Sequence, residues 1–162
     1  MAEQLILEGS TREELYRELY LQLQALLGAE TDRIANLANM AAALRQTFGF
    51  FWVGFYLVSE RELVLGPFQG DIACTRIPYG RGVCGDAWAK EMTLVVPDVD
   101  SYPGHIACSS LSRSEIVVPI RSVRGEVVGV LDVDSQELGD FTEEIDRPWL
   151  EQYVGLLAPL FP

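Results

Sequence analysis

Positive charge and ionisable bases are scarce in this chain of 162 residues. Lysine and arginine together number 12, against 24 aspartate and glutamate residues, and the net charge is −12. This balance argues against a nucleic-acid-binding protein, which needs a basic surface, and against binding to anionic membranes. The single lysine is Lys90 and the single histidine is His105, so a Schiff base and an imidazole base have one candidate each.

Long hydrophobic runs are absent as well. No segment approaches the roughly 18 consecutive apolar residues of a membrane span. The N-terminal segment MAEQLILEGS lacks the basic region and the long apolar region of a secretory signal, so we expect a cytoplasmic protein. The chain has 3 cysteines, and structural disulfides are rare in a reducing compartment. The cysteines are therefore expected to be core residues, metal ligands or redox reagents.

The spacing of apolar residues predicts helices at the N-terminus. A capping box of Ser10 and Glu13 would begin a first helix that Gly28 ends. A second helix would run from about Thr31 to Phe48. Both contain apolar residues at helical spacing: Leu15, Leu19, Leu23 and Leu26 in the first, and Ile34, Leu37, Ala41 and Leu44 in the second.

Aromatic and β-branched runs then predict strands. Residues 50–58 and 63–68 read as a hairpin, 92–99 as a short strand stopped by Pro97, and 114–135 as two strands around the turn SVRGE. The segment FTEEIDRPWLEQYVGLL restores helical spacing, with Pro148 in its first turns. This order predicts a single α+β domain over 1–162, with N-terminal helices over about 10–48. A mainly antiparallel sheet, loops and a C-terminal helix would occupy about 50–158.

The segment GRGVCGDAW, residues 80–88, matches the pattern G-x-G-x-x-G of a dinucleotide-binding loop. Such a loop follows a hydrophobic strand and opens a crossover helix. Here the preceding CTRIPY contains Pro78 and is too short and mixed for a central parallel strand. The chain that follows lacks a full crossover helix. We interpret the glycines as positions where the backbone turns sharply and lets a ligand or a loop approach Cys84.

All three cysteines, Cys74, Cys84 and Cys108, lie in segments rich in glycine, proline or serine. A cysteine in a loop is a candidate for a chemical role, because an inert cysteine usually lies in a core element. A pair of such thiols can carry out thiol–disulfide chemistry. Three alternatives stay open: buried core residues, a zinc site that adds His105, and a hydrolase dyad of His105 with Cys108. The zinc site would lack a close C-x₂₋₄-C spacing.

Acidic residues mark a second candidate site. Asp132 and Asp134 share one face of a strand, and Glu115 begins a neighbouring strand. Like charges on one face repel unless a cation lies there or one acid keeps its proton. The set is either a solvated strand end or a pocket for an ammonium group with one acid as proton donor. Trp52 and Tyr56 would also share a face, as walls of that pocket or as core.

Six segments in order resemble one family: FFWVGFYL, LGPFQGDIACTRIPYGRGVCGDA, YPGHIACSS, SEIVVPI, GVLDVDS and FTEEI. They are similar to free methionine-(R)-sulfoxide reductases, which are built on a GAF domain. The resemblance covers about residue 50 to the C-terminus in detail and the N-terminal helices in outline. It implies a GAF-like six-stranded antiparallel sheet flanked by helices. It also implies reduction of free L-methionine (R)-sulfoxide, recycling by thioredoxin, no metal, flavin or nicotinamide on this chain, and a homodimer.

The resemblance also assigns roles to residues. Cys108 matches the nucleophile that attacks the sulfoxide sulfur, Cys84 matches its resolving partner in a disulfide, and Cys74 matches an auxiliary cysteine. Glu115 and Asp134 match groups that assist protonation of the sulfoxide oxygen. The residues that would contact the substrate are Trp52, Tyr56, Glu115, Asp132 and Asp134. The rival function is a sensory GAF module for a small ligand, although the acids would repel an anionic cyclic nucleotide.

Overall fold

The computed structural model describes residues 4–162, which build a six-stranded antiparallel sheet. The strand order is β3-β2-β1-β6-β5-β4. The strands are β1 (Trp52–Ser59), β2 (Glu62–Gln69), β3 (Arg76–Pro78), β4 (Leu94–Val96), β5 (Ser114–Arg121) and β6 (Val127–Ser135). The expected α+β class and the expected antiparallel sheet are confirmed.

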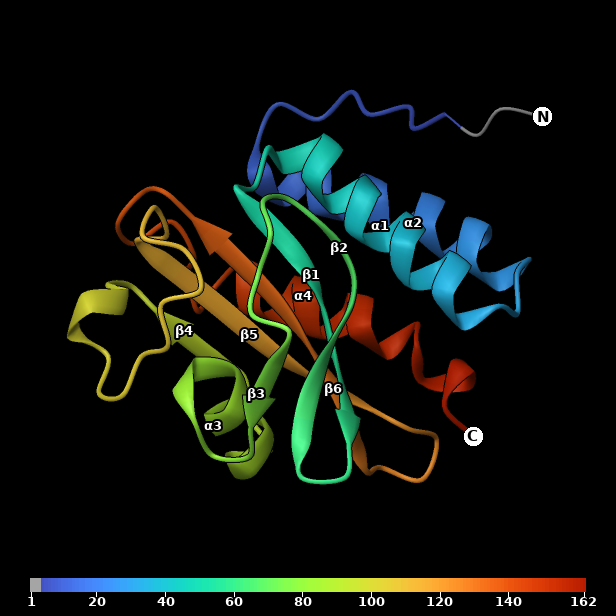
Figure 1. Cartoon of the computed structure of the whole chain (residues 1–162). Coiled ribbons are helices and arrows are strands. Elements are labelled where there is room, and N and C mark those ends of the chain that lie inside the picture. Colours follow the sequence, from blue (N-terminus) through green and yellow to red (C-terminus); the bar gives the residue numbers. More distant parts are fainter. Residues whose placement is uncertain (1–3) are drawn as a thin grey trace.

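Helices from both ends of the chain cover one face of this sheet (Figure 1). They are α1 (Arg12–Gly28), α2 (Arg33–Phe48) and α4 (Asp146–Gly155), and the short α3 (Gly82–Lys90) packs on the opposite face. Two 3₁₀ turns, η1 (Val99–Ser101) and η2 (Ala158–Leu160), complete the described elements. Among residues 4–162, no helix has both the length and the apolar character needed to cross a bilayer.

The alternation of side chains along the central strands produces two separate hydrophobic clusters. Val53 and Phe55 of β1 and Val133 of β6 face the terminal helices. Trp52 and Tyr56, at the alternate positions of β1, face α3 instead. Because successive residues of a strand point to opposite faces, one period-2 pattern determines both layers. The helix-covered layer is mostly apolar, and the layer under α3 contains the acidic groups of the pocket described below.

Helix α3 differs from the sequence interpretation, in which no helix follows the glycine-rich segment. The helix has only 9 residues, too few to show a clear apolar period. Gly80 and Gly82, before and at its start, have φ angles of 69° and 63°, which favour glycine. Gly85 packs closely on β3, because a Cβ there would stand 2.6 Å from the carbonyl oxygen of Pro78. The glycines therefore serve a sharp turn and a close approach, as expected, but they open a helix.

Two details of the N-terminal helices were wrongly predicted. The capping box of α1 consists of Thr11 and Glu14, one residue later than expected, with the Glu14 N–H donating to Thr11 Oγ1 at 3.2 Å. The hydroxyl of Ser10 donates to the same Glu14 carboxylate and supports this cap. Ile34, expected in the core, is 69% exposed because it lies in the first turn of α2, away from the sheet.

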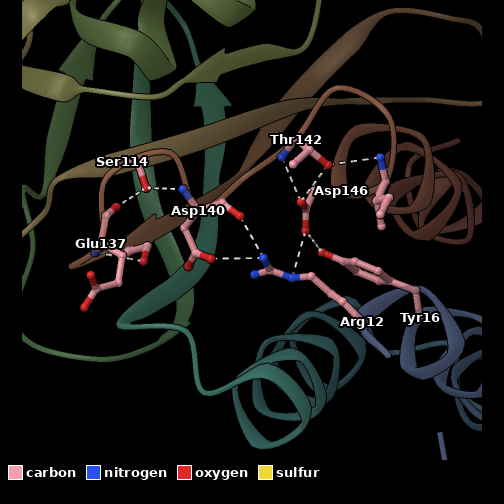
Figure 2. A network of polar contacts seen from close by, with 9 residues as sticks. Arg12, Tyr16, Ser114, Glu137, Asp140, Thr142 and Asp146 are labelled. Carbon is pink, nitrogen blue, oxygen red and sulfur yellow. Dashed lines mark hydrogen bonds and ion pairs between the residues drawn. The ribbon is translucent and has the colours of Figure 1, made fainter. Parts of the chain in front are cut away.

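A buried carboxylate links α1 to the start of α4 (Figure 2). Asp146 accepts hydrogen bonds from the Tyr16 hydroxyl at 2.7 Å and from the Thr142 N–H at 2.8 Å. The Arg12 Nε lies 3.2 Å from the same carboxylate, and Arg12 also donates to the Asp140 side chain at 3.0 Å. This network attaches the first helix to the loop that follows β6.

We expect Asp146→Ala to lower the free energy of unfolding by about 2–3 kcal/mol, because a buried carboxylate loses its hydrogen bonds and Arg12 loses a partner. Denaturant unfolding followed by circular dichroism measures the change. Glu143→Ala is the control, since it removes an ion pair of 2.8 Å with Arg147 that is exposed to solvent. It should change stability by less than about 1 kcal/mol. Equal losses in the two variants would contradict a special role for the network.

Candidate functional site

Strand register brings the three acidic side chains to the face of the sheet that α3 covers. Asp134 of β6 lies opposite Trp52 of β1 on one side and opposite Glu115 of β5 on the other. Asp132 lies two residues away on the same strand, opposite Gly54. Residues i and i+2 of a strand share a face, so the shared orientation expected from the sequence is confirmed.

Two of these carboxyl groups are buried, and that of Asp134 is partly buried. Glu115 is 5% exposed and Asp132 is 7% exposed. Asp134 accepts a hydrogen bond from the Ser112 hydroxyl at 2.6 Å, whereas Oδ1 of Asp132 has no hydrogen-bond partner within residues 4–162. The interpretation as a solvated strand end is therefore wrong. A buried carboxyl oxygen without a partner is costly, so it marks a position that a ligand's donor can satisfy.

Burial raises the pKa of each of the three carboxyl groups. Burial, followed by the nearby Asp134, raises the pKa of Glu115 to about 8. Burial and the neighbouring Glu115 raise the pKa of Asp132 well above its usual value. The pKa of Asp134 is raised by burial and by Asp132. The cluster therefore retains protons at neutral pH, and a cation that enters it would favour the ionised forms.

Two other side chains contact Glu115. The Nε2 of His105 lies 3.6 Å from its Oε2, and the Sγ of Cys84 lies 3.9 Å from its Oε1. Burial lowers the pKa of His105 and raises the pKa of the Cys84 thiol, so both groups are uncharged at neutral pH. The contact of His105 with Glu115 therefore joins neutral groups. The hydrolase dyad of His105 with Cys108 is not formed in this structure, because the Cys108 sulfur is bonded to another cysteine.

That partner is Cys74, which forms a disulfide with Cys108 across 34 residues. The expected pairing of Cys84 with Cys108 is therefore wrong for the disulfide present here. Cys74 lies between β2 and β3, Cys108 lies before β5, and their Cα atoms come within 5.3 Å of each other. Cys84 is held in the first turn of α3 as a buried free thiol.

The disulfide also bears on two other interpretations of the cysteines that the sequence left open, a zinc site and plain core residues. The zinc site of the three cysteines with His105 cannot form in this disulfide state, because sulfurs bonded to each other are not thiolate ligands. The interpretation of all the cysteines as plain core residues is wrong. Cys74 and Cys108 are only partly buried, lie in loops and are crosslinked.

Trp52 and Tyr56 position the loop that carries Cys74. The indole N–H of Trp52 donates to the carbonyl oxygen of Asp71 at 3.0 Å, and the Tyr56 hydroxyl donates to the carbonyl oxygen of Cys74 at 2.9 Å. Gly70, with a φ of +140°, lets the loop lie against the indole, because a Cβ there would stand 2.5 Å from Trp52 Cδ1. Both aromatic side chains line the pocket and also support one of its walls.

One pocket, between the sheet, α3 and the two cysteine-bearing loops, is lined by the three acids, Cys84, His105, Cys108 and the two aromatic side chains. Gly82 and Val83 of the first turn of α3 also line it, and the N–H groups of a first helical turn have no acceptor within their own helix. Arg81, at the N-cap of α3, is a further lining residue. Sequence reasoning missed Arg81 and Ser112, because neither belongs to a periodic pattern and the helix that places Arg81 was not predicted. The pocket offers a positive helix end and carboxyl groups together, which suits a zwitterion.

Comparisons with known proteins identify the family to which this fold belongs. A family model of the GAF domain matches residues 31–161. The chain is 59% identical over 158 residues to GAF domain-containing protein A of Dictyostelium discoideum, covering 97% of this chain and 99% of that protein. It is 48% identical over 145 residues to free methionine-R-sulfoxide reductase of Escherichia coli (strain K12), covering 89% and 87%. The chain also superimposes with a TM-score of 0.94 on a solved structure, the X-ray structure of free methionine-R-sulfoxide reductase from Neisseria meningitidis in complex with its substrate. The two chains are 56% identical, and the match covers 98% of this chain and 95% of that one.

The raised pKa of Glu115 has a measurable consequence for stability. The native state holds the Glu115 proton up to about pH 8, whereas the unfolded chain releases it at lower pH. The contribution of Glu115 to stability must therefore fall as pH rises above the unfolded pKa and through the window up to about pH 8. Glu115→Gln removes this contribution, so its gain in Tm over the unsubstituted protein should increase from about pH 5 to about pH 8. Each kcal/mol corresponds to about 2–4 °C for a domain of this size.

Thermal unfolding across this pH range, with the disulfide kept intact, is the measurement. Glu144→Gln, at an exposed position, removes the same kind of charge and is the control. A gain in Tm for Glu115→Gln that does not change with pH would contradict the raised pKa.

Proposed function

This chain belongs to the GAF-domain family and, within it, to the free methionine-R-sulfoxide reductases, which are oxidoreductases, and we propose that it reduces free L-methionine (R)-sulfoxide to L-methionine. One observation carries the proposal: Cys108, which belongs to a cysteine pair able to exchange two electrons, lines the same pocket as Glu115, Asp132 and Asp134. The thiols supply the electrons for reduction of a sulfoxide, and the acids supply a proton and an ammonium site.

The pocket selects the free amino acid by binding the ammonium and the carboxylate group of the substrate at two different places. The substrate ammonium binds at Glu115, Asp132 and Asp134, where it satisfies the unpartnered Oδ1 of Asp132. The substrate carboxylate lies toward Arg81 and the first turn of α3, whose N–H groups and helix dipole favour an anion. A methionine sulfoxide within a peptide has no ammonium group, so its binding would leave the buried acids unpaired.

The reductive step begins with a proton. Glu115 or Asp134, kept protonated by burial, donates to the sulfoxide oxygen and makes it a better leaving group. The Cys108 thiolate attacks the sulfoxide sulfur and forms a sulfur–sulfur bond. The protonated oxygen then passes to the Cys108 sulfur, while the sulfur–oxygen bond of the substrate and the new sulfur–sulfur bond break. Methionine leaves, and the oxygen ends on Cys108 as a sulfenic acid. Trp52 and Tyr56 contact the substrate and keep the Cys74 loop in place.

Recycling then uses Cys74. Its thiol condenses with the Cys108 sulfenic acid, which forms the sulfur–sulfur bond and releases water. The disulfide in the structure supports Cys74 in this role rather than Cys84. A raised pKa also disfavours the thiolate form of Cys84. Thioredoxin, in the cytoplasm, supplies the dithiol that reduces the disulfide through a mixed disulfide, so the electrons reach this chain without a bound cofactor.

Substrate choice tests the proposal directly. NADPH consumption with thioredoxin and thioredoxin reductase should accompany turnover of free L-methionine (R)-sulfoxide. The S epimer and an N-acetylated, amide-capped sulfoxide should each have a kcat/KM lower by about 100-fold or more. The same kcat/KM for the capped and the free substrate would refute the ammonium site.

The thiol roles are tested by single turnover without reductant. Cys108→Ser should release no methionine, because the nucleophile is lost. Cys74→Ser should release up to one equivalent and then stop, because the sulfenic acid cannot be resolved by its partner. Cys84→Ser should still form the Cys74–Cys108 disulfide, which peptide mapping under non-reducing conditions detects. A dominant Cys84–Cys108 linkage in the unsubstituted protein after turnover would refute the assignment to Cys74.

A further inference from the structure

The thiol of Cys84 has no part in the reaction proposed above, although it lies buried against two of the acids. We propose that Cys84, Glu115 and Asp132 bind a thiophilic divalent cation such as Zn²⁺. Because the same acids take the substrate ammonium, the bound ion inhibits the reductase by competition, and this consequence rests on the function proposed above. The site is an inhibitory one, distinct from any cofactor site for the reaction.

The donor atoms already lie close together. One ligand atom from each residue lies within 4.8 Å of the others, and the Sγ of Cys84 is 3.9 Å from Oε1 of Glu115. In a tetrahedral zinc site, with Zn–S of about 2.3 Å and Zn–O of about 2.0–2.2 Å, sulfur and oxygen ligands stand roughly 3.5 Å apart. Small side-chain movements therefore suffice. The donors lie on α3, β5 and β6, so the backbone positions are set by regular elements.

The unpartnered oxygen of Asp132 points independently to a cationic ligand. Asp132 is 7% exposed and lines the pocket, and its Oδ1 has no hydrogen-bond partner among the described residues. A buried carboxylate oxygen is stabilised by a donor or by a cation. The substrate ammonium is one such cation and a metal ion is another, so the two compete for one position.

The chemistry of the donors selects the class of ion. A thiolate with carboxylates suits Zn²⁺ and disfavours Mg²⁺ and Ca²⁺, which prefer sites made of oxygen alone. His105, with Nε2 at 3.6 Å from Oε2 of Glu115, lies close enough to act as a fourth ligand after a small shift. Binding replaces the thiol proton and the carboxyl protons, which pass to solvent, and no electrons are transferred.

The disulfide form of the protein makes a sharp test possible, because Cys84 is then the free thiol of a chain with 3 cysteines. Co²⁺, which replaces Zn²⁺ in such sites and absorbs light, is titrated into this form without any thiol reagent. We expect one equivalent to produce a thiolate-to-cobalt charge-transfer band, and Zn²⁺ to abolish it. Cys84→Ala should lose the band. Asp132→Asn and Glu115→Gln should weaken Co²⁺ binding by at least about 10-fold.

Asp86→Asn is the matched control, since Asp86 lies on the same helix but accepts a hydrogen bond from Tyr102. It should bind Co²⁺ as the unsubstituted protein does. Absence of the band, or unchanged affinity in both Asp132→Asn and Glu115→Gln, would overturn the site. This titration needs no turnover, so its outcome is independent of the sulfoxide reductase activity.

Competition is tested in the same titration. Free methionine should raise the apparent Kd for Co²⁺, after correction for Co²⁺ that methionine binds in solution. An apparent Kd that methionine leaves unchanged would overturn the shared position, even if the ion binds.

Discussion

The structure depends on the placement of three carboxyl groups, two buried and one partly buried, on one face of an otherwise apolar sheet. Such groups cost free energy, so the opposite face has to supply the stability, and it does so by packing three helices against the central strands. Strand register determines which residues lie on each of the two faces. A slip of one residue in β6 would turn Asp132 and Asp134 into the helix core and Val133 toward α3. The pattern that builds the core therefore also specifies the site.

The position of Glu115 depends on contacts that begin far from the pocket. The hydroxyl of its neighbour Ser114 donates to the carbonyl oxygen of Glu137 at 2.6 Å and accepts from the N–H of Asp140 at 3.4 Å. Asp140 also accepts from Arg12, which belongs to the network around Asp146. A continuous set of polar contacts thus connects α1 to the first residue of β5 (Figure 2). The N-terminal helix therefore supports the strand end that carries an acid of the pocket.

Features that follow from the local alternation of side chains could be predicted from the sequence. Features that depend on contacts between loops could not. The central strands and the shared face of Asp132 and Asp134 follow from alternation, so they were predicted correctly. The burial of these acids was left open, because it depends on α3, whose 9 residues are stabilised by packing rather than by propensity. The pairing of Cys74 with Cys108 was missed for a similar reason. Two irregular segments meet there, and no spacing in the sequence encodes their separation.

The Cys74–Cys108 crosslink encloses β3, α3, β4 and η1, and its span of 34 residues links folding to redox state. In the chain-entropy description, a closed loop of this length restricts the unfolded chain by about 3–4 kcal/mol. By thermodynamic linkage, the folded protein stabilises its own disulfide by the same amount relative to the unfolded chain. The oxidised form is then the more resistant to unfolding, and each reduction gives up that protection. When reductant is scarce, the protein would therefore accumulate in the oxidised form, which is the more resistant to unfolding.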